Sequence, residues 1–157
     1  MKMKTACFMM LLAVAITGLN AQTAKEEVDF MQSLFGMEKK ALVAEFVKPG
    51  AAQKDAFWQL YDEYEMDRKE LGKKRIGLLL KYEENFDNLS NELAGDLLKE
   101  ILALQKQTDK LLASYVKKVS KAASPVVAMQ FHQVEMYVLS EIRVALAGGL
   151  PFPETIN

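Results

Sequence analysis

The sequence predicts an all-α protein of four helices, folded as two antiparallel helical hairpins. Two observations support this prediction. Apolar residues recur at helical spacing through most of the chain after residue 24, and short segments rich in helix-breaking residues separate the periodic stretches. The regions before and after each break are therefore expected to be separate helices.

The first helix is predicted over residues 25–47 and ends before Pro49-Gly50. The apolar residues of its expected buried face are Val28, Met31, Phe35, Leu42 and Phe46.

The second helix is predicted over residues 51–84, and its inward stripe advances by alternating steps of four and three residues. This 3.5-residue period is typical of a left-handed helix pair. A helix of this size is about 50 Å long, which favours an elongated molecule or a homodimer. The stripe consists of Phe57, Tyr61, Tyr64, Arg68, Leu71, Arg75, Leu78 and Tyr82.

The third and fourth helices are marked by capping signals. A turn is expected over residues 85–91, with Ser90 capping the third helix. The same period in that helix predicts that it folds back on the second as an antiparallel hairpin. Ser124-Pro125 predicts the start of the fourth helix, which ends at Gly148-Gly149. Beyond that end, Leu150 and Phe152 are expected to dock on the bundle.

An export signal is predicted at the start of the chain. Lys2 and Lys4 precede an apolar run over residues 8–19, and cleavage is expected after Ala21, with Ala24 as the alternative. The run is shorter than the roughly 20 residues of a membrane-spanning helix, so no stable membrane anchor is expected. Residues 1–21 are thus predicted to be a signal peptide and residues 22–157 a single helical domain in the periplasm.

Charge and residue inventory exclude several classes of function. Without Lys2 and Lys4, 18 of the 20 basic side chains remain against 21 acidic ones, a net charge of −3, which argues against nucleic-acid binding. Cys7 is the only cysteine, and one histidine is present. No nucleophile with its base and no glycine-rich phosphate loop is recognisable. We therefore expect neither an enzyme nor a cofactor.

Three motifs carry a family resemblance: Phe57-Trp58-x-x-Tyr61-x-x-Tyr64-Glu65-x-x-Arg68, Phe131-x-Gln133-x-Glu135, and Ile142-Arg143-x-x-Leu146-Ala147-x-x-Leu150-Pro151. Together they resemble a family of uncharacterised secreted bacterial helical proteins, over about residues 38–154. The chain is also distantly similar to the Spy and CpxP group of periplasmic stress proteins. Of that group's Leu-Thr-x-x-Gln motif, the segment Pro49-Gly50-Ala51-Ala52-Gln53 keeps only the glutamine. The resemblance implies a chaperone or envelope-stress protein.

The aromatic side chains of the first motif have two interpretations. Phe57, Trp58, Tyr61 and Tyr64 could form a binding platform, since tyrosine and tryptophan offer large contact areas. Their helical spacing favours core packing instead. Trp58 lies about 100° away from the stripe and is the one expected to reach another surface.

Charged residues within apolar stripes predict a buried ion pair. Arg68 and Arg75 interrupt the stripe of the second helix, and Glu135 lies on the apolar face of the fourth. We expect Glu135 to pair with one of these arginines, with Gln133 or a tyrosine hydroxyl nearby, in a structural role. The alternative is an acidic ligand held by Arg68, Arg75 and Arg143.

A soft-metal site is the remaining candidate. Met129, His132 and Met136 stand at i, i+3 and i+7, so all three can point from one face of the fourth helix toward a metal such as Cu(I). The competing interpretation is that the methionines only fill space.

The functional expectation is a non-enzymatic periplasmic binding protein that holds unfolded or envelope proteins. The alternatives are a soft-metal or small-anion sensor, and a structural partner of an envelope complex. A broad exposed apolar patch would favour protein partners, whereas a pocket with convergent polar groups would favour a ligand.

Overall fold

The computed structural model describes residues 38–153, and this part of the chain is all-α. A short helix spans residues 38–46. It is followed by α3 (Lys54–Glu84), α4 (Asn91–Ala122) and α5 (Pro125–Gly149). The predicted fold class is thus confirmed for the described residues. The predicted signal peptide and the first part of the expected first helix lie outside them.

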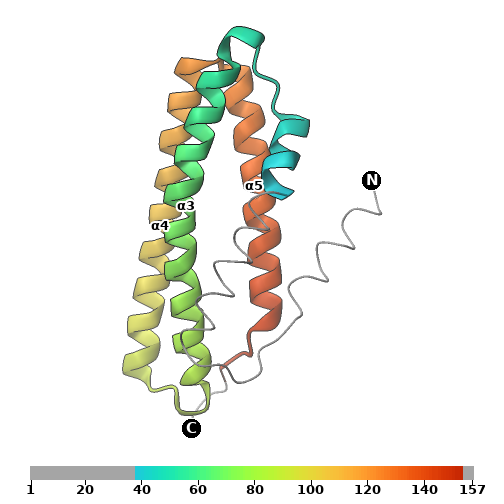
Figure 1. Ribbon diagram of the computed structural model, residues 1–157. Coiled ribbons are helices and arrows are strands. Elements are labelled where there is room, and N and C mark those ends of the chain that lie inside the picture. Colours follow the sequence, from blue (N-terminus) through green and yellow to red (C-terminus); the bar gives the residue numbers. More distant parts are fainter. Residues whose placement is uncertain (1–37, 154–157) are drawn as a thin grey trace.

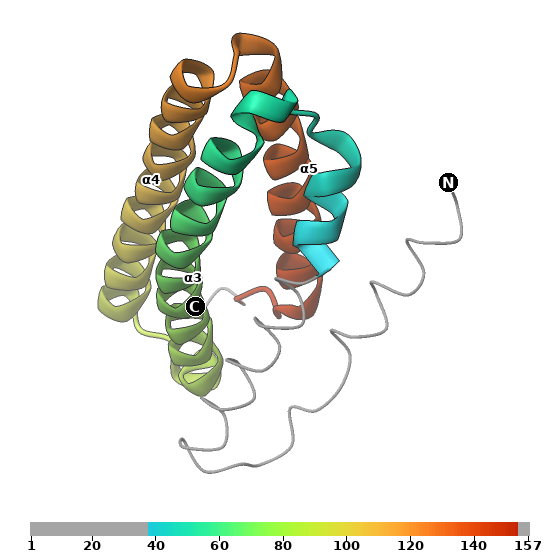
Figure 2. The same ribbon diagram turned by 45° about the horizontal axis from the view of Figure 1, so that its top comes forward.

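The three long helices lie side by side and alternate in direction (Figures 1 and 2). The turn after α3 forms one hairpin with α4, and the turn after α4 forms a second hairpin with α5. The 38–46 helix lies beside the first half of α5 (Figure 2), where the Lys48 amide donates to Gln130 Oε1 at 3.0 Å. Within residues 38–153, the fourth helix covers one end of the bundle.

Local signals set the helix boundaries as predicted. Ser90 accepts a hydrogen bond from the Leu93 amide, and Ser124 accepts one from the Val127 amide, so each serine satisfies an otherwise unpaired N–H group. Pro125 occupies the first turn of α5. One boundary differs, because a 3-10 turn occupies Ala51–Gln53 and α3 begins only at Lys54.

The apolar core lies at the end of the bundle that the 38–46 helix covers. In α3 the buried residues extend from Phe57 only to Arg68, although the helix continues to Glu84. The main cluster of buried apolar side chains includes residues from the short helix and the segment after it, and from α3, α4 and α5. Its members are Val43, Val47, Phe57, Tyr61, Tyr64, Leu112, Tyr115, Val119, Val127, Ala128, Phe131, Val134 and Val138. The short helix thus packs on the end of the bundle that holds the main cluster, and α4 also buries Leu97 and Leu104 toward the other end.

The segment after α5 does not dock as predicted. Leu150 is half-buried, but the Phe152 side chain is 88% exposed. The Tyr82 hydroxyl donates to the Pro151 carbonyl at 2.7 Å. A hydrogen bond to the backbone thus holds this segment against α3, and burial of Phe152 is not part of the attachment.

Within residues 38–153, none of the helices combines the length and the apolar character that a bilayer crossing requires.

Candidate functional site

A lysine of the short helix lies at the centre of a buried ionic cluster. Lys39 Nζ contacts Glu65 Oε1 at 2.5 Å and Glu135 Oε2 at 2.7 Å, and its side chain is only 1% exposed. The ammonium also lies 5.8 Å and 5.2 Å from the ring centroids of Tyr61 and Tyr64. One cation therefore joins the 38–46 helix to α3 and α5.

A second cation completes the cluster. Arg68 donates from Nε to Glu65 Oε1 at 2.8 Å and from Nη2 to Glu65 Oε2 at 3.0 Å. This two-point geometry matches the planar guanidinium to the carboxylate. The ionic cluster, defined as Lys39, Glu65, Arg68 and Glu135, thus contains two cations and two carboxylates, whose formal charges cancel.

Two tyrosines border the ionic cluster. The Tyr64 hydroxyl donates to Glu135 Oε2 at 2.8 Å. Burial raises the pKa of Tyr61 and Tyr64 above the ordinary value, and the nearby glutamates raise it further, so both phenols stay neutral. The Tyr61 hydroxyl and Glu135 Oε1 are buried and make no hydrogen bond with the described residues.

The two carboxyl groups of the ionic cluster have pKa values displaced in opposite directions. Burial opposes the ionisation of Glu65, but Lys39 and Arg68 outweigh it, so the pKa of Glu65 lies below its ordinary value. At Glu135 burial outweighs the attraction of Lys39, and the pKa lies above its ordinary value.

The prediction that an arginine pairs with Glu135 is wrong, because the cation that contacts Glu135 is Lys39. Arg68 instead hydrogen-bonds Glu65, and Gln133 is exposed on the outer side of α5. The expected tyrosine hydroxyl is present and belongs to Tyr64.

The sequence contained a signal for Lys39 that was missed. Lys39, Val43 and Val47 are spaced at i, i+4 and i+8 and are all buried. The face predicted for this helix was centred instead on Leu42 and Phe46, and Phe46 is 52% exposed. The helix is thus rotated by about one residue from the expected orientation, which brings the lysine inside.

The aromatic residues of α3 form the core rather than an open platform. Phe57, Tyr61 and Tyr64 are buried, and all three meet Phe131 of α5. Trp58 is half-buried and packs edge-on against Phe57, with ring centroids 5.0 Å apart. The packing interpretation is therefore confirmed for the three buried rings.

The three arginines proposed to hold an acidic ligand do not form one site. Arg68 belongs to the ionic cluster, whereas Arg75 donates to Gln105 Oε1 at 3.1 Å. Gln105 in turn donates to Asp109 at 2.8 Å, and Asp109 lies 3.6 Å from Arg143. Arg75 and Arg143 thus belong to a separate polar network that links α3, α4 and α5.

The sequence-predicted metal residues lie outside the ionic cluster. Met129, His132 and Met136 are all exposed on the outer side of α5. Residues 38–153 contain no group of three or more histidine, cysteine, aspartate or glutamate side chains arranged to hold a metal ion.

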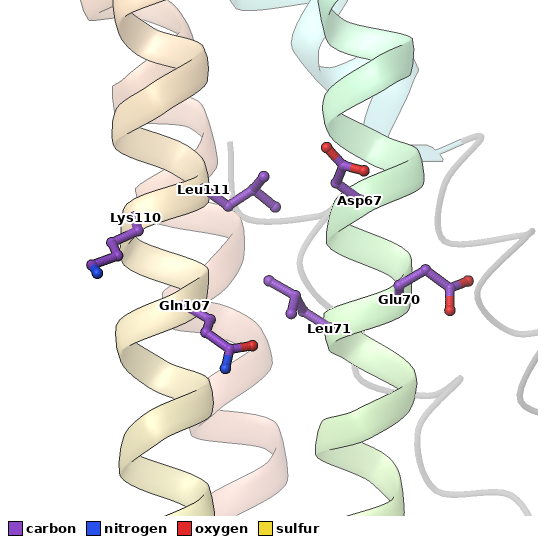
Figure 3. A pocket seen from close by; sticks show the side chains of 6 residues that line it. All are labelled: Asp67, Glu70, Leu71, Gln107, Lys110 and Leu111. Atoms are coloured by element: carbon purple, nitrogen blue, oxygen red, sulfur yellow. The ribbon is translucent and has the colours of Figure 1, made fainter.

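A shallow depression of about 410 Å³ lies between α3 and α4. Leu71 and Leu111 point into the space between the two helices, whereas Lys110 extends away from it (Figure 3). The other lining residues are Asp67, Glu70 and Gln107, and Asp67 accepts a hydrogen bond from Tyr115. The depression therefore lacks the convergent polar groups of a typical ligand pocket.

The geometry of the ionic cluster supports a structural role. Its charged groups contact one another across the 38–46 helix, α3 and α5, and their side chains are at most 10% exposed. Buried ion pairs add little net stability in general, and in some proteins they specify how helices fit together. The cluster therefore orients α5, and with it the residues on the outer side of that helix.

The pH dependence of stability tests the charge states of the ionic cluster. Glu65 has a pKa below its ordinary value of 4.5, so its ionised form stabilises the fold, and this contribution is lost as the pH falls below that value. The pKa of Glu135 is displaced upward, so the pH dependence of its contribution is opposite. Glu135 contributes to the stability of the fold at low pH, and this contribution is lost as the pH rises through its raised pKa. Glu65→Gln should therefore lose less stability than the wild type on acidification, as measured by urea denaturation. Parallel curves for the two proteins would contradict this assignment.

Comparisons with known proteins found no match: no family model, curated protein or solved structure matches the chain. The family resemblance of the sequence motifs thus stays a prediction.

Proposed function

We propose that this protein is a non-enzymatic periplasmic binding protein that holds unfolded or partly folded envelope proteins on the outer face of α5. We define the α5 outer face by its exposed apolar residues, Val126, Met129, Met136, Tyr137 and Val144. At 100° per residue these side chains fall within an arc of about 100°. The observation that carries the proposal is this arc of exposed apolar side chains, which the exposed Gln133 and Ser140 interrupt.

The part of the α5 outer face before Ser140 differs from other exposed apolar surface because it has no exposed charge, whereas Val144 lies beside Glu141 and Arg143. Between Pro125 and Ser140 the only charged residue is Glu135, which is buried. On α4, by contrast, the exposed Leu98 and Leu102 are interspersed with Lys99 and Glu100. Exposed apolar patches commonly mark sites of protein contact. The predicted export signal supports the periplasm as the compartment.

Suppression of client aggregation tests the proposal. The purified protein should suppress aggregation of a reduced, unfolding client without ATP, as followed by light scattering. The double variant Val126→Glu, Tyr137→Glu places charges on the α5 outer face. Because burial of each apolar side chain is worth about 1.5 kcal/mol or more, loss of both should raise the protein concentration needed for equal suppression by about a hundredfold.

The matched control is Leu98→Glu with Leu102→Glu, which adds the same charges at comparably exposed positions on α4. It should suppress client aggregation as well as the wild type does. Both double variants should keep the helicity of the wild type, as measured by circular dichroism. Lack of suppression by the wild type at molar excess would overturn the chaperone proposal and favour a structural partner of an envelope complex. Equal losses in both variants would show that α5 is not the specific surface.

A further inference from the structure

We propose that Met129, His132 and Met136 form a site for a soft monovalent cation, Cu(I) or its chemical analogue Ag(I), on the exposed side of α5. The site shares Met129 and Met136 with the α5 outer face, but metal binding does not require client holding. The proposal rests on the orientation of α5, on the exposure of the three side chains and on the chemistry of the donors that they provide.

The packing of α5 fixes which residues face outward. Phe131, Val134 and Val138 are buried against the other helices. Glu135 is completely buried and bonded to Lys39 and Tyr64, which prevents the helix from rotating freely about its axis. The opposite side of the same two turns is consequently held toward solvent.

The three donors converge on that opposite side. Met129 and Met136 are 59% and 39% exposed, and His132 is exposed as well. At 100° per residue they occupy an arc of about 60°, with the histidine about 4.5 Å and 6 Å along the axis from the two methionines. Neighbours three and four residues apart share a helix surface. The His132 imidazole and the thioethers of Met129 and Met136, one on each side of it along the helix, can therefore bind the same ion.

The donor chemistry selects the ion. Two thioethers and one imidazole are soft or borderline ligands, which suit Cu(I), whereas Mg²⁺ and Ca²⁺ require oxygen ligands. The one carboxylate between Pro125 and Ser140 is that of Glu135, which points into the core. This side of α5 therefore offers no carboxylate between Pro125 and Ser140, whereas its two thioethers and imidazole suit a thiophilic ion.

Ag(I) titration of the full chain tests the proposal. Cys7→Ser is used as the background, because a thiolate would otherwise compete for the ion. The methionine methyl groups are labelled with ¹³C and followed by NMR during addition of silver nitrate. Because both thioethers would bind the same soft ion, the Met129 and Met136 signals should shift together and saturate at about one ion per chain.

Met66 provides an internal control, since it is 63% exposed on α3 and has no histidine within a helical turn. Its signal should respond only to excess silver. His132→Ala should weaken binding by about tenfold or more, since even supporting groups around metals contribute this much. Met129→Leu and Met136→Leu should also weaken binding, because each removes one thioether ligand. A response of Met66 or another methionine at the same silver concentration, or unchanged binding in His132→Ala, would overturn the site.

Discussion

Lys39→Met is expected to lower the free energy of unfolding by about 3 to 5 kcal/mol, because it removes one partner of a buried charge pair. Lys39 is 2.7 Å from Glu135, whose side chain is completely buried. Without the ammonium, Glu135 keeps its hydrogen bond from Tyr64 but loses its contacting cation. Glu65 keeps Arg68 and should be less affected. Urea denaturation followed by circular dichroism measures the change.

The adjacent lysine provides the control. Lys40 pairs with Asp62, but their side chains are 46% and 57% exposed, so Lys40→Met should cost only about 1 kcal/mol. A second variant separates loss of charge balance from damage to the fold. Combining Lys39→Met with Glu135→Leu removes both charges and should recover part of the stability. Equal unfolding midpoints for Lys39→Met and Lys40→Met would refute the structural role of the ionic cluster.

Phe131→Ala should lower the free energy of unfolding by about 3 to 5 kcal/mol, because it leaves a cavity in the aromatic core. Phe131 is fully buried. Its ring centroid lies 6.2 Å, 6.5 Å and 5.3 Å from those of Phe57, Tyr61 and Tyr64, each in an edge-on arrangement. These partners are all on α3 and cannot easily collapse into the space. Thermal and urea unfolding should both show the loss.

Phe152→Ala is the same chemical change at a site with 88% exposure. It should alter stability by no more than about 0.5 kcal/mol. A large loss of stability in Phe152→Ala would mean that the segment after α5 docks on the bundle through this side chain. A small loss of stability in Phe131→Ala would show that the core rearranges to fill the cavity.

These two anchors connect the core to the proposed binding surface. Phe131 and Glu135 hold the inner side of α5, and the exposed Met129, Met136 and Tyr137 alternate with them along the same turns. Weakening either anchor is therefore expected to loosen the orientation of the α5 outer face. The proposed client holding and the proposed metal binding would both depend on that orientation.

The sequence by itself predicted the helical fold and most of its boundaries, because these depend on local chemistry. Ser90 and Ser124 cap the helices that they were expected to cap, and Pro125 lies in the first turn of α5. The repeated 3.5-residue period also predicted the hairpin of α3 and α4. Caps and periodicity act within one or two turns, so neighbouring residues carry the necessary information.

Only the tertiary structure decided which charges and rings meet. Lys39 and Glu135 are 96 positions apart, and their contact depends on a rotation of the 38–46 helix by about one residue. Apolar periodicity determines the buried face of a short helix too coarsely to distinguish Val43 and Val47 from Leu42 and Phe46. Phe152 is exposed, and its segment contacts α3 through the hydrogen bond from the Tyr82 hydroxyl to the Pro151 carbonyl. Such contacts depend on how distant helices fit together in space, which short-range patterns do not encode.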